Sequence, residues 1–191
     1  MSLSNPSRSA LIVIDVQASF AQMPFWSQGI HAPFQEALLK LDAGARAAGV
    51  PVVHIYHVGR AGPFLPESGF VQPLPWLPGN PAVRFDKHTH NAFTDTGLDL
   101  WLRRQGISKL IISGIRTEQC CETTARVGSD LGYDVDFVSE ATLTFPMTHA
   151  GSGRTFSAED ITTRTELVLA DRFARILDVD TCLAGLAAAS I

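Results

Sequence analysis

Three side chains in this sequence could together cleave a bond at a carbonyl carbon. Cys120 supplies a thiol, which attacks carbonyl carbons as a thiolate, and Asp15 supplies a carboxylate that can accept its proton and later activate water. Lys87 supplies an ammonium that would favour the thiolate. Taken singly, these residues have ordinary explanations as a buried small residue, a turn former and a solvated surface charge. They become a catalytic set only if the fold brings them together.

The elements around these residues predict that they meet at one edge of a sheet. Residues 10–15 (ALIVID) read as a buried strand that ends on Asp15, and a short extended run precedes Lys87. A further apolar strand at residues 109–115 leads into a predicted helix at 117–131, whose first turn holds Cys120. Ligands of open α/β sheets bind outside the carboxyl ends of the strands, so we predict the site there.

The remaining periodicity indicates an α/β fold made of one domain. Apolar runs with strand character alternate with segments of helical spacing along the chain, and 191 residues suit a single core. We therefore predict a three-layer α/β/α sandwich with a mostly parallel, Rossmann-like sheet of about six strands, spanning residues 1–191. The other predicted strands are 51–56, 134–139 and 173–179, and the other predicted helices are 33–48, 96–104, 158–172 and 181–189.

Composition argues against several classes of partner. The net charge of −4 does not suit nucleic acid, and no apolar run approaches the ~18 residues of a membrane span. Residues 1–9 lack the features of a signal peptide, so we expect a cytoplasmic protein without membrane contact that acts on a small-molecule substrate. Three cysteines cannot form a disulfide framework.

Residues 59–81 have no regular periodicity and contain six of the eleven prolines. A loop of more than ~12 to 15 residues inside a compact domain is usually functional or disordered. Its aromatic residues indicate packing over something, either as a lid on the active site or as a surface buried against a second subunit.

Three sequence blocks resemble one known family. They are IDVQASF at residues 14–20, KHTHNAF at 87–93 and GIRTEQCCETTA at 114–125. Their order and spacing resemble the isochorismatase-like cysteine hydrolases, which include nicotinamidase and N-carbamoylsarcosine amidase. The resemblance implies a single isochorismatase-like hydrolase domain with a catalytic triad of Asp15, Lys87 and Cys120. It also implies a homo-oligomer, a dimer or larger.

The same resemblance implies how the reaction would proceed. The backbone N–H groups of Arg116 and Cys120 would form an oxyanion hole after a cis peptide bond between Ile115 and Arg116. Cys120 would form a thioester while a C–N bond of a small amide or carbamoyl compound is cleaved. Two alternatives stay open: an isochorismatase-type vinyl-ether hydrolase, and a catalytically silent binding or assembly protein with this fold.

The histidines do not predict a metal site. Nicotinamidases of the family carry an Asp-x-His motif after the second strand, whereas this chain has His54 and His57 there, on opposite faces if the strand continues. We therefore predict neither metal nor other cofactor, with His57 in the pocket and His54 in the core. His88 and His90 are expected to be hydrogen-bonded or exposed.

The aromatic and cationic residues inside the blocks are candidates for substrate binding. Phe20 and Phe93 could form the walls of a pocket for a planar substrate, although core packing is an equal alternative. The guanidinium of Arg116 could favour an anionic substrate, or it could pair with Glu118 or Glu122.

Overall fold

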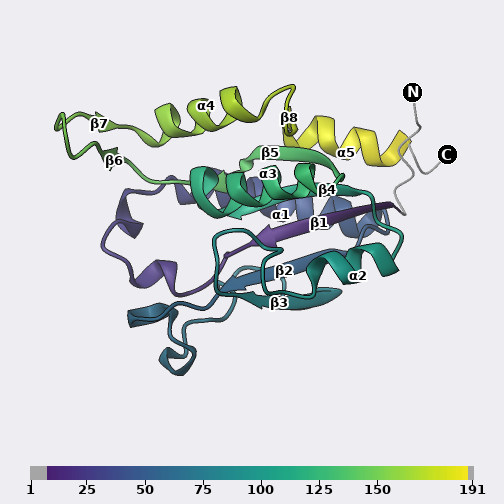
Figure 1. The fold of residues 1–191 in the computed structure, drawn as a ribbon, viewed down its shortest axis with the longest axis horizontal. Helices are drawn as coiled ribbons and strands as arrows, with labels where there is room; N and C mark the ends of the chain where they lie inside the picture. The colour runs from purple at the N-terminus through teal and green to yellow at the C-terminus, as the bar shows by residue number, and fades with distance from the viewer. Residues whose placement is uncertain (1–7, 189–191) are drawn as a thin grey trace.

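The computed structural model describes residues 8–188 and has the predicted three-layer α/β/α architecture (Figure 1). Its main sheet is parallel, with the strand order β3-β2-β1-β4-β5-β8. The strands are β1 (Ser9–Ile14), β2 (Val52–His57), β3 (Val83–Lys87), β4 (Lys109–Ile115), β5 (Asp134–Leu143) and β8 (Arg175–Leu177). The order reverses at β1, which leaves a crevice at the carboxyl ends of β1 and its neighbours.

Helices cover both faces of the sheet (Figure 1). They are α1 (His31–Ala47), α2 (Leu98–Arg104), α3 (Glu122–Asp130), α4 (Ala158–Leu169) and α5 (Val179–Ala188). Helices α1 and α5 pack on one face with Leu11 and Val13 of β1, and the other helices pack on the opposite face with Ala10, Ile12 and Ile14. A strand buried on both faces needs the continuous apolar run that this sequence has. Within residues 8–188, no helix is long and apolar enough to cross a membrane.

Several element boundaries differ from the predicted ones. Strand β5 continues to Leu143, because β4 resumes pairing with it at Gly114 and Thr142 after a register shift. The last strand, β8, is shorter than the predicted 173–179. The closing helix, α5, begins at Val179 and not at residue 181, and residue 189 of the predicted helix lies outside the described part of the chain. A small antiparallel pair, β6 (Met147–Thr148) with β7 (Thr155–Phe156), was not predicted, because strands of two residues carry no periodicity.

The proline-rich loop packs against its own chain. It contains only two single turns of 3₁₀ helix, Gly62–Phe64 and Pro66–Ser68, as its lack of periodicity predicts. The Ala18 N–H donates to the Gln72 carbonyl at 2.8 Å, which ties the loop to the segment that follows β1. The loop therefore lies beside the carboxyl end of the central strand.

Candidate active site

A buried ion pair joins the carboxyl ends of β1 and β3. Asp15 follows β1 in the left-handed region (φ 53°), and its N–H donates to the Ile55 carbonyl at 2.8 Å. Lys87 is the last residue of β3, and its Nζ lies 2.9 Å from Asp15 Oδ2. The two side chains are 0% and 1% exposed, so neither charge can rely on water. Such burial is tolerated only when the two charges neutralise each other.

The Lys87 ammonium is the centre of the cluster. Besides Asp15, its Nζ lies 3.4 Å from Cys120 Sγ and 3.4 Å from His57 Nδ1, and it donates to the Thr89 carbonyl at 3.1 Å. Burial lowers the pKa of Lys87, but Asp15 and Cys120 together raise it by more. The pKa of Lys87 is thus raised, so Lys87 stays protonated. The distances show that the fold brings together Asp15, Lys87 and Cys120, the residues of the predicted triad.

Cys120 lies in a turn that sequence periodicity did not separate from the helix after it. A π-helical turn, Thr117–Cys121, precedes α3, and the N–H groups of Gln119 and Cys121 both donate to the Arg116 carbonyl at 3.2 Å. The Ile115–Arg116 peptide bond is cis, as the resemblance implied. The oxyanion hole itself stays a prediction.

The surroundings of Cys120 as a whole favour the neutral thiol, although Lys87 lowers the pKa of Cys120 as predicted. Burial raises the pKa of Cys120, and the Asp15 carboxylate raises it further, while Lys87 lowers it by less. The main physical reason is burial, which takes the thiol out of water and disfavours its anion. The Asp15 carboxylate adds to this effect, and Lys87, which is paired with Asp15, offsets only part of it. Asp15 is therefore positioned as the base that must remove the thiol proton.

The triad opens onto a cavity of about 390 Å³. Its wall contains the predicted residues Phe20, His57 and Arg116. The full lining is Asp15, Phe20, Phe25, His57, Gly59, Arg60, Ala61, Phe64, His90, Arg116, Gln119 and Cys120. Gly59, Arg60, Ala61 and Phe64 belong to the proline-rich loop, so its first part forms one wall of the cavity, and its role as a lid stays a prediction. The subunit-contact alternative is untested.

Phe93 is not part of this wall, and its predicted role in substrate binding is wrong. Its ring stacks on Tyr133 at a centroid distance of 5.9 Å, inside the core beneath α2 and α3. The cause is local: the Asn91 side chain accepts hydrogen bonds from the N–H groups of Phe93 and Thr94, which turns the chain away from the cavity.

Arg116 pairs with Glu118, as one of its two predicted roles requires, and it also lines the cavity, where a contact with substrate stays a prediction. Its guanidinium lies 3.0 Å from Glu118 Oε1 and sits over the rings of Phe25 and Phe145 at 5.3 and 5.4 Å. The positive charge at this part of the wall is thus compensated by Glu118, and pairing with Glu122 does not occur.

Several residues of the site were not identified from sequence. Gln17 is fully buried, accepts from the His57 N–H at 2.7 Å and donates to the His57 carbonyl at 3.0 Å, so it fixes the end of β2 against the turn after β1. The sequence feature that could have identified Gln17 is its place in the first block, IDVQASF. His90 lines the cavity with its ring parallel to that of His57 within 8°. His90 and Gln119 also lie inside the sequence blocks, whereas Arg60 carried no distinguishing pattern.

The other histidines are occupied in hydrogen bonds. His54 is buried with its Nδ1 3.0 Å from the Tyr56 hydroxyl, on the opposite face from His57, and His88 Nδ1 lies 3.1 Å from the Val58 carbonyl. Within residues 8–188, no group of three or more His, Cys, Asp or Glu side chains is arranged to hold a metal ion.

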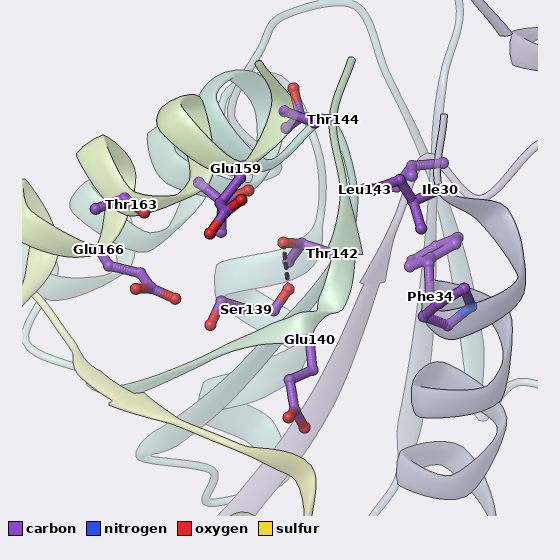
Figure 2. Close-up of a pocket in the computed structure, with 13 residues that line it drawn as sticks. Ile30, Phe34, Ser139, Glu140, Thr142, Leu143, Thr144, Glu159, Thr163 and Glu166 are labelled. Atoms are coloured by element: carbon purple, nitrogen blue, oxygen red, sulfur yellow. Dashed lines mark hydrogen bonds between the residues drawn. The ribbon is translucent and has the colours of Figure 1, made fainter. Parts of the chain in front are cut away.

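A second cavity, of about 410 Å³, lies between α1, α4 and the end of β5 (Figure 2). Glu140, Glu159 and Glu166 are among its lining residues, together with apolar side chains such as Phe34. Its lining includes no cysteine or lysine and none of the predicted site residues. The triad cavity is therefore the candidate active site.

Comparisons with known proteins identify the family to which this chain belongs. The isochorismatase domain model matches residues 9–166. Nicotinamidase 3 of Arabidopsis thaliana is 29% identical over 192 residues, covering 92% of this chain and 87% of that protein. A streptothricin hydrolase of Streptomyces noursei is 34% identical over 146 residues, covering 71% of this chain and 50% of that protein. The crystal structure of a cysteine hydrolase from Pseudomonas syringae pv. phaseolicola has a TM-score of 0.88 at 26% identity, covering 99% of this chain and 97% of that one. With the predicted fold and the assembled triad, these matches show that the chain belongs to the isochorismatase family of hydrolases.

Proposed function

We propose that this protein is a cysteine hydrolase that cleaves the C–N bond of a small amide or carbamoyl compound through a thioester on Cys120. One observation carries the proposal. Cys120 lines an open cavity while its Sγ lies 3.4 Å from Lys87 Nζ, which is itself 2.9 Å from the Asp15 carboxylate. A nucleophile, a base and a cation that orients the base are thus within reach of one substrate atom.

The reaction begins with proton transfer, because the resting thiol is neutral. Asp15 takes the Cys120 proton as the sulfur attacks the substrate carbonyl, and the N–H groups of Arg116 and Cys120 hold the developing oxyanion. The C–N bond then breaks, and the leaving amine takes the proton from Asp15. Asp15 next removes a proton from water, which attacks the thioester, releases the acid and returns the proton to Cys120. Lys87 keeps Asp15 oriented throughout.

The relatives support hydrolysis in general, since their names include nicotinamidase, streptothricin hydrolase and cysteine hydrolase. A vinyl-ether hydrolase would share this fold, but it would leave the thiol beside Asp15 without a use. The proposed C–N chemistry uses all three buried groups. We also propose a small-molecule substrate and a homo-oligomeric assembly, the latter on family resemblance alone.

Replacement of Cys120 tests the proposal. Ammonia release is measured over a panel of amides, ureas and N-carbamoyl compounds, and the acyl-enzyme is sought by intact-mass spectrometry after rapid acid quenching. Cys120→Ala should lose both turnover and the added mass, while Cys121→Ala, which removes the buried neighbouring thiol, should retain both. Hydrolysis by purified Cys120→Ala would refute covalent catalysis by this residue.

A further inference from the structure

The charges around the triad cavity are paired, with one exception. Asp15 is neutralised by Lys87, and Arg116 lies against Glu118. His57 adds no charge near neutral pH, because burial and the adjacent Lys87 ammonium lower its pKa. The inner part of the cavity is therefore close to neutral.

Arg60 is the exception. It is exposed and lines the cavity, and among residues 8–188 no ion pair or hydrogen bond of its side chain is found. A guanidinium at a cavity mouth, with no partner of its own, presents a planar fork that matches a carboxylate.

The loop holds Arg60 at this position by a tight closure. The Gly59 N–H donates to the Phe64 carbonyl at 2.8 Å, and a Cβ at residue 59 would lie 2.8 Å from Phe64 Cβ. Glycine is therefore needed for the close approach. Phe64 in turn packs edge-on against Phe20 at 5.1 Å, so the turn that carries Arg60 rests on the aromatic wall of the cavity.

We propose that the cavity selects small amides or carbamoyl compounds that carry a carboxylate, and that Arg60 binds this carboxylate while the C–N bond faces Cys120. The inference rests on the proposed function for the reaction and adds the substrate class. It also moves the anion-binding role from Arg116, whose charge is compensated, to Arg60, whose side chain has no ion pair within the described part of the chain. The aromatic residues Phe20, Phe25 and Phe64 would contact the apolar part between the two ends.

A pair of thiol reagents tests Arg60 without knowledge of the substrate. Iodoacetate and iodoacetamide have nearly the same size and differ in charge; in both reactions Cys120 sulfur forms a bond to carbon while iodide leaves and the thiol proton passes to base or buffer. The measured quantity is the ratio of the two alkylation rates at Cys120, read by peptide mass spectrometry. Arg60→Gln should lower the iodoacetate-to-iodoacetamide ratio by roughly 1.5- to fivefold, the range for a contact with an exposed, screened charge.

Matched variants separate a local effect from net charge. Arg104→Gln removes another exposed arginine, at the end of α2 and outside the cavity, and should leave the ratio unchanged. Arg60→Lys keeps the charge and should retain most of the preference. Added salt should reduce the preference in the unmodified protein, since an exposed charge is screened. An equal ratio in the unmodified protein and Arg60→Gln, or alkylation by neither reagent, would overturn the inference.

Hydrolysis gives a second readout that distinguishes the two proposals. The specificity constant for succinamate relative to its neutral diamide, succinamide, should fall in Arg60→Gln and not in Arg104→Gln. If amides are hydrolysed and this ratio of specificity constants is the same in the unmodified protein and in Arg60→Gln, the carboxylate inference is overturned and the proposed function stands. A charge preference in alkylation, with no hydrolysis across the whole panel of amides, ureas and carbamoyl compounds, would overturn the proposed function alone.

Discussion

Removing one charge from the buried Asp15–Lys87 pair should destabilise the protein more than removing both. At 2.9 Å, the pair's attraction is about 6 kcal/mol for an effective dielectric constant of about 20. Lys87→Met leaves Asp15 ionised without a partner and should cost about 3 to 5 kcal/mol, as breaking buried pairs does. That is a large share of the ~5 to 15 kcal/mol of a typical domain, and it is measurable by urea unfolding.

The matched substitution is Asp15→Asn, because asparagine tolerates the left-handed conformation at this position. This substitution leaves the buried Lys87 ammonium without its partner carboxylate, so it should also destabilise the protein. The double variant removes both charges, so its loss should be smaller than the sum of the single losses by about 2 to 4 kcal/mol. All three variants should be inactive as hydrolases.

Thiol reactivity provides an independent readout in the same variants. After burial, Asp15 is the strongest influence that raises the pKa of Cys120, and Lys87 opposes it. Asp15→Asn should therefore speed alkylation of Cys120 by iodoacetamide at pH 7.5 although turnover is lost, and Lys87→Met should slow it. Additive losses of stability, together with slower alkylation in Asp15→Asn, would refute this account of the pair.

Two further predictions concern stability. Burial lowers the pKa of His54 to about 4, so as pH falls the unfolded chain binds this proton first and stability is lost between about pH 6.5 and 4. The unfolding free energy is therefore measured at pH 7.5 and at pH 5 for the unmodified protein and for His54→Gln. The difference between the two pH values should be smaller by about 1 to 2 kcal/mol in His54→Gln, and the same difference in both proteins would exclude His54 as the cause. Gly114→Ala would place a Cβ 2.0 Å from the Ile14 carbonyl oxygen at φ 124°, and it should abolish folding or sharply lower Tm. At Gly185 in α5, an added Cβ would have no neighbour within 4 Å, so Gly185→Ala should stabilise the protein by roughly 0.5 to 1 kcal/mol. Similar Tm values for Gly114→Ala and Gly185→Ala would contradict the close approach of Gly114 to Ile14.

The fold and the three reactive residues could be predicted because their signals are local. Five apolar residues before Asp15 and the mostly apolar run Lys109–Ile115 indicate buried strands, and parallel strands bring their carboxyl ends to one edge. The family resemblance then singled out the lysine and the cysteine. Homo-oligomerisation and a cytoplasmic location stay predictions.

The rest of the site depends on side-chain direction in irregular segments, which periodicity does not encode. After β3 the chain has no regular repeat, so whether His90 or Phe93 faces the cavity is decided by the hydrogen bonds of Asn91. The role of Arg60 depends likewise on the closure between Gly59 and Phe64. The pKa of Cys120 depends first on burial and then on the balance between Asp15 and Lys87, and the spacing of residues reveals neither.

The cavity wall is built from two kinds of backbone, and this division bears on how such a protein can change during evolution. Asp15 and Lys87 stand at strand ends held by the sheet, whereas Phe25, Arg60 and Phe64 belong to connecting segments. Loops accept substitutions and insertions more readily than strands. Exchanging the segment around Arg60 would alter which molecules enter the cavity while leaving the reacting groups in their present positions. Chains of this architecture can therefore diverge in specificity without rebuilding their chemistry, and relatives named for substrates as different as nicotinamide and streptothricin are what such divergence would produce.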